Sequence, residues 1–208
     1  MNAFCQDTKP VTKKFNGSKQ ISEMYSVLKS DVQTKQGEYI SYFQVTDYEY
    51  KQIKKGTHKS DGYIKQKGNY KNGNKDGEWV EYSRPYELKT KGNYKNDKKV
   101  GIWLTSKEQG KVFERFDYDN NKKLSPIIHI NPTYPRSAVE SELEGTVTVS
   151  FQTHIDCSIT DITVTKSLSV DCDRTAIESI KKYEELFKKY GVDCEEKTER
   201  QEIKFVLK

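Results

Sequence analysis

The chain has 208 residues, of which 33% are hydrophobic and 32% are charged, and its formal net charge is +5. This length fits one large domain or two small ones, and so low an apolar fraction is lean for a single large core. No apolar run approaches the roughly 20 residues that a transmembrane helix needs. The 14 tyrosines favour strands and turns, because aromatic side chains suit pleated, half-buried surfaces.

The charge changes sign along the chain. Residues 1–50 carry 6 basic and 6 acidic side chains, residues 51–124 carry 19 and 10, and residues 125–208 carry 11 and 15. The middle part is therefore basic and the C-terminal part acidic, which predicts a boundary near Leu124. We expect an N-terminal segment at 1–35, a middle domain at 36–124 and a C-terminal domain at 125–208.

The N-terminal segment begins with an unusual stretch. Small and apolar residues precede Gln6 and a Thr- and Lys-rich stretch follows, as at the end of a signal peptide. Cys5 is an alternative lipidation site, although Phe4 is bulky for the residue before a lipidated cysteine. The rest of the segment is expected to be irregular, or to form short strands or a short helix.

Internal repetition dominates the middle part. Residues 67–82 align with residues 91–104 at a constant offset of 24. The matched pairs are Gly68 and Gly92, Tyr70 and Tyr94, Asn72 and Asn96, Gly77 and Gly101, and Trp79 and Trp103. A weaker half-copy at 37–42 resembles 77–82 at an offset of 40, which predicts an insertion around residues 47–59.

Each unit of this repeat is expected to form a strand, a turn and a strand. Asn72-Gly73 is typical of a type I′ hairpin turn, in which both central residues need positive φ, and Asn96-Asp97 and Asn120-Asn121 are weaker versions of it. A lone hairpin is marginal in water, so successive hairpins are expected to stack their aromatic faces. The aromatic residues expected in this repeat core are Tyr70, Trp79, Tyr82, Tyr94, Trp103 and Tyr118.

The repeat pattern, Gly-aromatic-Lys-Asn-Gly-Lys followed by Asp-Gly-Glu-Trp, resembles the MORN-type repeats of bacterial envelope proteins. The resemblance is closest over residues 67–82. It implies protein or lipid contacts, and so a scaffold or a second binding surface. The lysines are spread through the expected turns, which favours a solvated surface over nucleic-acid binding. Peripheral membrane association stays open, and no nucleic-acid partner is expected.

The C-terminal part shows the patterns of five successive elements, two helices and three strands. A helix is expected after Pro135 with Gly145 as its stop, and its buried side would hold Ala138, Val139 and Leu143. Residues 146–153 and 159–167 alternate apolar and polar side chains, which is typical of a half-buried antiparallel hairpin. A second helix would run from an N-cap at Asp173 to Gly191, and a last strand would cover residues 201–208.

The order α-β-β-α-β predicts two helices on one face of a three-stranded antiparallel sheet. The fold class expected for the whole chain is therefore β-rich plus α+β: stacked β-hairpin repeats followed by an α-β-β-α-β domain.

The cysteines and histidines do not suggest a metal site. There is no CxxC pair, and His58, His129 and His154 are scattered, so we expect neither metal nor cofactor. Three cysteines lie in the C-terminal part, and one disulfide among them is plausible in an oxidising compartment. Cys172 with Cys194 is the simplest pair, Cys157 with either is the alternative, and free thiols remain open.

The C-terminal elements resemble the carboxy-terminal domain of TonB over about residues 130–208. The residues that carry the resemblance are Tyr134-Pro135, Gly145-Thr146-Val147, Asp161-Ile162, Lys166-Ser167 and Asp173. Domains of this family capture a short peptide of an outer-membrane transporter by strand addition at the last strand. The resemblance therefore implies partner binding by Gln201, Glu202, Ile203, Lys204, Phe205, Val206 and Leu207. Of these, Ile203, Phe205 and Leu207 would be anchored in the core.

This resemblance implies a non-enzymatic protein-interaction module in the periplasm or cell envelope, with outer-membrane association open. Its partner would be a protein or peptide, such as an outer-membrane transporter or an envelope complex. Two alternatives remain. One is an assembly protein whose strand edge serves oligomerisation. The other is a TonB-type protein that transduces energy for transport, if an N-terminal anchor precedes this sequence. Catalysis is disfavoured, because no nucleophile has a base at a suitable spacing.

Overall fold

The computed structural model describes residues 7–56, 60–129 and 132–207. Cys5 and His58 lie outside these ranges, so the expectations for them stay predictions. The chain divides into two compact units, Met1–Gly110 with Arg115–Leu124, and Lys111–Glu114 with Ser125–Lys208. Strands make up 51% and helices 20%, which confirms the strand-rich fold class.

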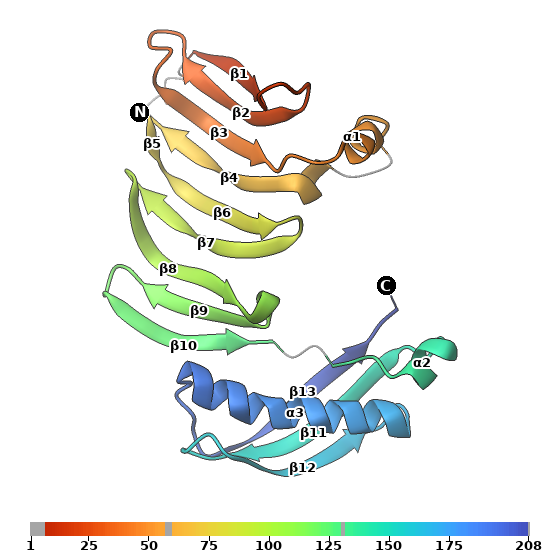
Figure 1. Cartoon of the computed structure of the whole chain (residues 1–208). Coiled ribbons are helices and arrows are strands. Elements are labelled where there is room, and N and C mark those ends of the chain that lie inside the picture. The colour runs from red at the N-terminus through yellow and green to blue at the C-terminus, as the bar shows by residue number, and fades with distance from the viewer. Residues whose placement is uncertain (1–6, 57–59, 130–131, 208) are drawn as a thin grey trace. The chain divides into compact units, whose positions relative to one another are not determined.

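One long antiparallel sheet of stacked hairpins makes up most of the first unit (Figure 1). Residues 112–114 and 125–128 of its last two strands belong to the second unit. Within the described residues the sheet has ten strands, in the order β1-β2-β3-β4-β6-β7-β8-β9-β10, with the short β5 paired to β4. The strands are β1 (Thr8–Lys14), β2 (Ile21–Leu28), β3 (Lys35–Tyr42), β4 (Ile64–Lys71), β5 (Asn74–Lys75), β6 (Gly77–Arg84), β7 (Glu87–Lys95), β8 (Lys98–Lys107), β9 (Val112–Asp117) and β10 (Lys122–Ile128). The residues before position 36 thus contribute two full strands to this sheet.

The hairpin turns have the conformation that the sequence predicts. Asn72 and Gly73 have φ of 50° and 83°, and Asn96 and Asp97 have φ of 50° and 63°. Both pairs are therefore left-handed at both central positions, as a type I′ turn requires. The turn chemistry of the two best repeat copies is confirmed.

A helix occupies the place of the expected insertion between β3 and β4. It is α1 (Asp47–Lys54), and it is followed by the 3-10 turn η1 (Ser60–Tyr63). Thr46 and Glu49 form a capping box at the helix start, in which each side chain bonds the other residue's backbone N–H. A second 3-10 turn, η2 (Glu108–Gly110), follows β8.

Trp79 and Trp103 are the buried centres of the hairpin array, with exposed fractions of 2% and 5%. Each indole packs directly on a glycine of the neighbouring strand. A Cβ added to Gly68 would lie 2.2 Å from the Trp79 ring, and one added to Gly92 would lie 2.3 Å from the Trp103 ring. The indole N–H groups donate to the carbonyls of Asn69 and Asn93 at 3.1 Å. The offset of 24 is therefore also a structural repeat.

A lysine covers the aromatic face in each repeat copy. The Nζ atoms of Lys35, Lys75 and Lys99 lie 4.8, 4.2 and 4.2 Å from the ring centroids of Tyr39, Trp79 and Trp103. Such contacts combine a cation–π attraction with cover from the apolar stem. Burial lowers the pKa of Lys75 and raises the pKa of Tyr70 to about 12. The face is therefore partly screened from water.

The other aromatic residues of the expected repeat core are less buried than the tryptophans. Tyr70, Tyr82 and Tyr94 are half-buried. Tyr118 is 40% exposed, although its ring contacts Trp103 with 6.2 Å between centroids. The tryptophans thus form the centre of the array and the tyrosines its margin.

The second unit has the order that the sequence predicts, namely α2 (Arg136–Glu140), β11 (Gly145–Thr153), β12 (Ile159–Lys166), α3 (Val170–Tyr190) and β13 (Lys197–Phe205). Its sheet has the strand order β12-β11-β13, and α3 packs on β11 and β12 (Figure 1). The fully buried core side chains include Val147, Val149, Cys172, Ile180 and Phe205. This arrangement confirms the expected α+β domain.

The first helix of this unit is shorter than expected. Glu142 has φ of 50°, and the N–H of Leu143 donates to the carbonyl of Ala138 at 2.9 Å. This left-handed termination ends the helix well before Gly145. Ala138 is buried as predicted, but Val139 is 44% exposed, so its assignment to the buried side is wrong.

The second helix begins earlier than expected. Ser169, and not Asp173, is the N-cap, and its hydroxyl accepts from the N–H of Cys172 at 3.2 Å. The Asp173 carboxylate instead accepts from the N–H of Leu168, before the helix, at 3.2 Å. Gly191 ends the helix in a left-handed conformation with φ of 66°, as predicted.

Candidate partner-binding edge

β13 is an edge strand with a long and regular register. It pairs with β11 over nine consecutive residue pairs, from Thr153–Lys197 to Gly145–Phe205, without a shift. In the part of the chain that the structure describes, β11 is the one strand that pairs with β13. The far side of an edge strand directs N–H and C=O groups away from its partner. β13 therefore offers a template for another strand.

The opposite edge, β12, is irregular. Its pairing with β11 shifts twice, at Thr148/Val149 and between Ser150 and Gln152. Asp161, within β12, has φ of 50°, a left-handed conformation unusual for a strand. Bulges and kinks of this kind blunt an edge against further pairing. Of the two edges of this sheet, β13 is the better template.

The residues expected to bind a partner separate into three groups in the structure. Ile203 and Phe205 point into the core, with exposed fractions of 3% and 0%, and Gln201 is half-buried on the same face. Glu202 and Lys204 alternate with them and are exposed. Val206 and Leu207 lie beyond the strand, with exposed fractions of 62% and 37%. The expectation that Leu207 is anchored in the core is therefore wrong.

The strand begins at Lys197, four residues before the expected start. Thr198 and Arg200 are exposed, whereas Glu199 is half-buried on the face toward α3. This stretch has polar residues on both faces, so hydrophobic alternation did not reveal it as a strand.

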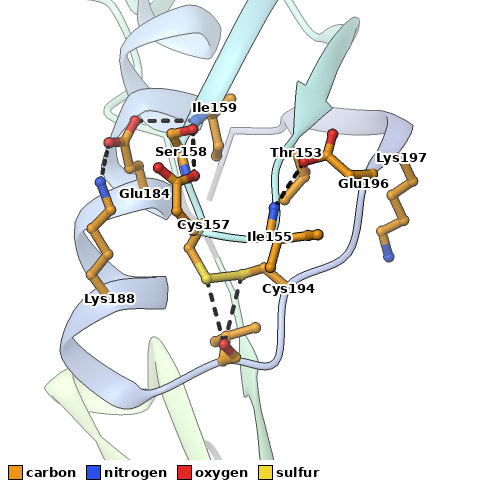
Figure 2. Close-up of a disulfide and its surroundings, with 12 residues drawn as sticks. Thr153, Ile155, Cys157, Ser158, Ile159, Glu184, Lys188, Cys194, Glu196 and Lys197 are labelled. Atoms are coloured by element: carbon orange, nitrogen blue, oxygen red, sulfur yellow. Dashed lines mark hydrogen bonds and ion pairs between the residues drawn. A yellow bond between two sulfur atoms is a disulfide. The ribbon is translucent and has the colours of Figure 1, made fainter.

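A disulfide holds the loop before β13. It joins Cys157, in the turn between β11 and β12, to Cys194, three residues before β13 (Figure 2). This pair is one of the alternatives that the sequence left open, and Cys172 is instead a free thiol buried in the core. The chain just before β13 is thereby tied covalently to the β11–β12 turn, at the end of the sheet where Thr153 pairs with Lys197.

Glu196 connects the loop before β13 to the β11–β12 turn a second time, beside the disulfide. Its carboxylate accepts from the N–H of Ile155 at 3.1 Å (Figure 2). The same carboxylate contacts Nδ1 of His154 at 3.0 Å. His154 Nε2 in turn lies 2.9 Å from the Thr160 hydroxyl. His154 therefore bridges two segments and has an evident structural role. These contacts fix the residue just before β13 to the β11–β12 turn.

A hollow of about 330 Å³ lies beside β13, and its lining includes Ser125, Pro126 and Ile128 from the part of β10 that belongs to the second unit. Three aromatic rings form one wall, because Phe151 and Tyr183 have centroids 6.5 Å apart and Tyr183 and Phe187 have centroids 5.3 Å apart. Glu199 and Gln201, from the inner face of β13, line another side. The hollow therefore adjoins the strand whose far edge is open.

The hollow has an acidic lining. Glu199 accepts from the Thr153 hydroxyl at 3.2 Å and forms an ion pair with Lys197 at 3.4 Å. Asp193 and Glu195 add two exposed carboxylates at its rim. Burial raises the pKa of the Tyr183 phenol, and the charge of Glu199 raises it further.

Glu184 links α3 to the start of β12. Its carboxylate accepts from Lys188 Nζ at 2.6 Å and from the N–H of Ile159 at 3.2 Å (Figure 2). The bond from Lys188, followed by the bond from Ile159, lowers the pKa of Glu184 below 4.5. A carboxyl with a depressed pKa in the folded state stabilises the fold above its unfolded pKa, and this contribution disappears as pH falls through the folded value.

We therefore expect the second unit to lose stability as the pH falls below about 4.5, and Glu184→Gln to reduce this pH dependence. The urea midpoint of the helical circular dichroism signal across an acid pH series measures it. Glu185→Gln removes a neighbouring charge on the same helix and serves as the control. An unchanged pH dependence in Glu184→Gln would contradict the assignment.

The described residues hold no group of three or more His, Cys, Asp and Glu side chains arranged to bind a metal ion. Glu140 forms an ion pair with Arg136, and the Glu144 carboxylate accepts from the N–H of Leu207. Among the helices in these ranges, none has the length and apolar character required to cross a membrane.

The comparisons with known proteins concern the second unit. Neither the curated proteins nor the solved structures contain a match to this chain. The resemblance of the hairpin array to MORN-type repeats stays a prediction. Residues 130–207 match the family described as Gram-negative bacterial TonB protein C-terminal, whose members are protein-interaction domains. The match supports a TonB C-terminal domain in this part of the chain.

Proposed function

We propose that the second unit captures a protein partner in the cell envelope by strand addition to the open edge of β13. In this proposal residues 125–208 form the capturing module, and the hairpin repeats of residues 36–124 serve as a scaffold or a second binding surface. The match of residues 130–207 to a family of interaction domains supports a protein partner. The protein acts as a binding module without catalysis.

The observation that carries this proposal is the difference between the two edges of the small sheet. β13 keeps one register over nine residue pairs, whereas β12 shifts twice against β11. Main-chain hydrogen bonds supply much of the affinity when an extended peptide adds to a sheet, so a straight, unshifted edge is the better acceptor. The core side chains Ile203 and Phe205 hold that edge in place.

The surroundings of β13 support a preformed binding edge. The disulfide between Cys157 and Cys194, together with the Glu196 contacts, fixes the chain just before the strand. An edge held in its bound conformation loses less conformational entropy when a partner binds. The disulfide also favours an oxidising compartment such as the periplasm.

Site-specific photo-crosslinking tests the proposal. A photoreactive residue placed at Glu202, exposed on β13, is expected to capture a partner from envelope extracts. The same residue at Thr163, exposed on β12, is the matched control and is expected to capture much less. Deleting residues 201–207 is a poorer test, because it removes Ile203 and Phe205 from the core.

Amide hydrogen exchange then examines the binding mode. Addition of a captured partner segment is expected to protect alternate amides of β13, because every second N–H faces the open edge. Equal crosslinking from the two edges, or uniform protection along β13, would contradict strand addition. Crosslinks between two copies of the chain through Glu202 would instead identify the edge as an oligomerisation surface.

A further inference from the structure

The hollow beside β13 has a chemical character that main-chain pairing alone does not explain. It combines an aromatic wall of Phe151, Tyr183 and Phe187 with the half-buried carboxylate of Glu199. We propose that this hollow binds the side chain of an arginine carried by the strand that pairs with β13. The inference rests on the proposed function and names the chemistry of the partner.

The position of the hollow follows from the alternation of side chains in a sheet. Glu199 and Gln201 lie on the face of β13 toward α3, and both line the hollow. A residue directly opposite them on an added strand would have its Cβ about 5 Å away on the same face. The side chains of a captured strand that lie opposite Glu199 and Gln201 are therefore directed to the hollow, and the intervening ones lie beside Arg200 and Glu202.

The charges around the hollow favour a cation. Glu199, Asp193 and Glu195 contribute three carboxylates, and Lys197 contributes one ammonium group. Two donors already reach one oxygen of Glu199, from Thr153 and Lys197, but a carboxylate has about four acceptor positions. Glu199 can therefore accept further N–H groups, whereas an incoming acidic side chain would be repelled.

The rings favour arginine over lysine. A guanidinium group is planar, stacks on aromatic rings and donates two parallel hydrogen bonds to a carboxylate. The wall formed by Tyr183 and Phe187, with 5.3 Å between ring centroids, offers ring surface next to this carboxylate. The more compact ammonium of lysine lacks the stacking plane and is more strongly hydrated.

An arginine scan of a synthetic strand tests the inference on the full chain. The probes are labelled nine-residue peptides, matched in length to β13, of alternating Thr and Val with one Arg at each position in turn. Fluorescence anisotropy is expected to show affinity rising about tenfold at the positions that lie opposite Glu199 and Gln201, two residues apart, since a hydrogen bond to a charged group contributes on this scale. Lys, Gln, Leu and Glu at the best position are expected to bind more weakly.

Two variants identify the carboxylate. Glu199→Gln keeps the size of the side chain and is expected to abolish the arginine preference. Glu178→Gln removes the same charge from an exposed position on α3 and is expected to preserve it. Asp193→Asn with Glu195→Gln, in the exposed rim, is expected to reduce the preference partly. Thermal unfolding of each variant checks that the fold is intact.

The possible outcomes separate the inference from the proposed function. Peptides that protect the amides of β13 but show no positional arginine effect, or keep the effect in Glu199→Gln, would overturn the arginine site alone. A preference for Leu at the best position would mean that the hollow is an apolar pocket and would overturn it as well. If no peptide protects β13 and no partner crosslinks at Glu202, strand addition itself fails.

Discussion

Replacing Trp79 by alanine is expected to lower the free energy of unfolding of the first unit by about 3 to 5 kcal/mol. The indole is 2% exposed and packs directly on Gly68, and its N–H donates to the carbonyl of Asn69. Its removal leaves a cavity at the centre of the array and takes away one of the two donors to the Asn69 carbonyl, the other being the N–H of Asp76. Neighbouring rings cannot fill the space, because Tyr39, Tyr70 and Tyr94 are held on their own strands.

The fluorescence of Trp103 measures this effect during urea unfolding, since both tryptophans of the chain lie in the first unit. Tyr118→Ala is the matched control. Tyr118 belongs to the same row of rings but is 40% exposed, so its loss is expected to cost only about 1 kcal/mol. Similar losses in the two variants would mean that Trp79 is not the centre of this core.

Removal of the disulfide, by Cys157→Ser together with Cys194→Ser, is expected to destabilise the second unit by about 3 to 4 kcal/mol. The bond closes a loop of 37 residues, and the conformational entropy that it removes from the unfolded chain is of this size. The variant is also expected to bind strand partners more weakly, because the chain before β13 loses its covalent attachment.

The helical circular dichroism signal measures this loss, since α3 is the longest helix described and lies in the second unit. Reduction of the wild-type protein is expected to reproduce the effect, and reduction of the double variant is expected to add nothing. Trp fluorescence should report little change in the first unit. An oxidised protein no more stable than the double variant would show that the bond is absent or without effect on stability.

The repeat was the part of the fold best predicted from the sequence. The constant offset of 24 placed the glycine, the turn and the tryptophan of each hairpin, and all three have equivalent roles in the two best copies. Such a pattern is readable because each position has a local requirement, such as positive φ in the turn. The covering lysines were not foreseen, because an exposed charged side chain gives no sign of the ring beneath it.

Two errors in the second unit, the N-cap of the second helix and the preferred disulfide pair, have a common cause at a helix terminus. Placing the N-cap at Asp173 left Cys172 in a loop, where pairing with Cys194 was the simplest choice. The helix begins after Ser169, so Cys172 lies in its first turn and its side chain is fully buried in the core. Ser169 and Asp173 are both good cap residues, and only the packing of the helix on the sheet decides between them.

The hollow was beyond sequence analysis for a related reason. The last strand that the sequence predicts begins at Gln201 and leaves out Glu199, because no apolar residue marks the first half of β13. Its role depends on the register with β11, which sets Glu199 opposite Phe151 and brings it close to Thr153. A register of this kind is a long-range property, and a local pattern does not encode it when both faces are polar.

Because the glycine–tryptophan contact repeats, the first sheet can be lengthened or shortened only by whole repeats, and so in steps of fixed size. Each 24-residue repeat contributes two strands. One duplication or deletion of a repeat therefore alters the length of the sheet, measured across its strands, by about 10 Å at the usual strand spacing. The new junction would reproduce the old one, because Gly68 with Trp79 and Gly92 with Trp103 make equivalent contacts. Evolution or design can therefore change the length of this array by changing the number of repeats, while the interior of each hairpin stays the same.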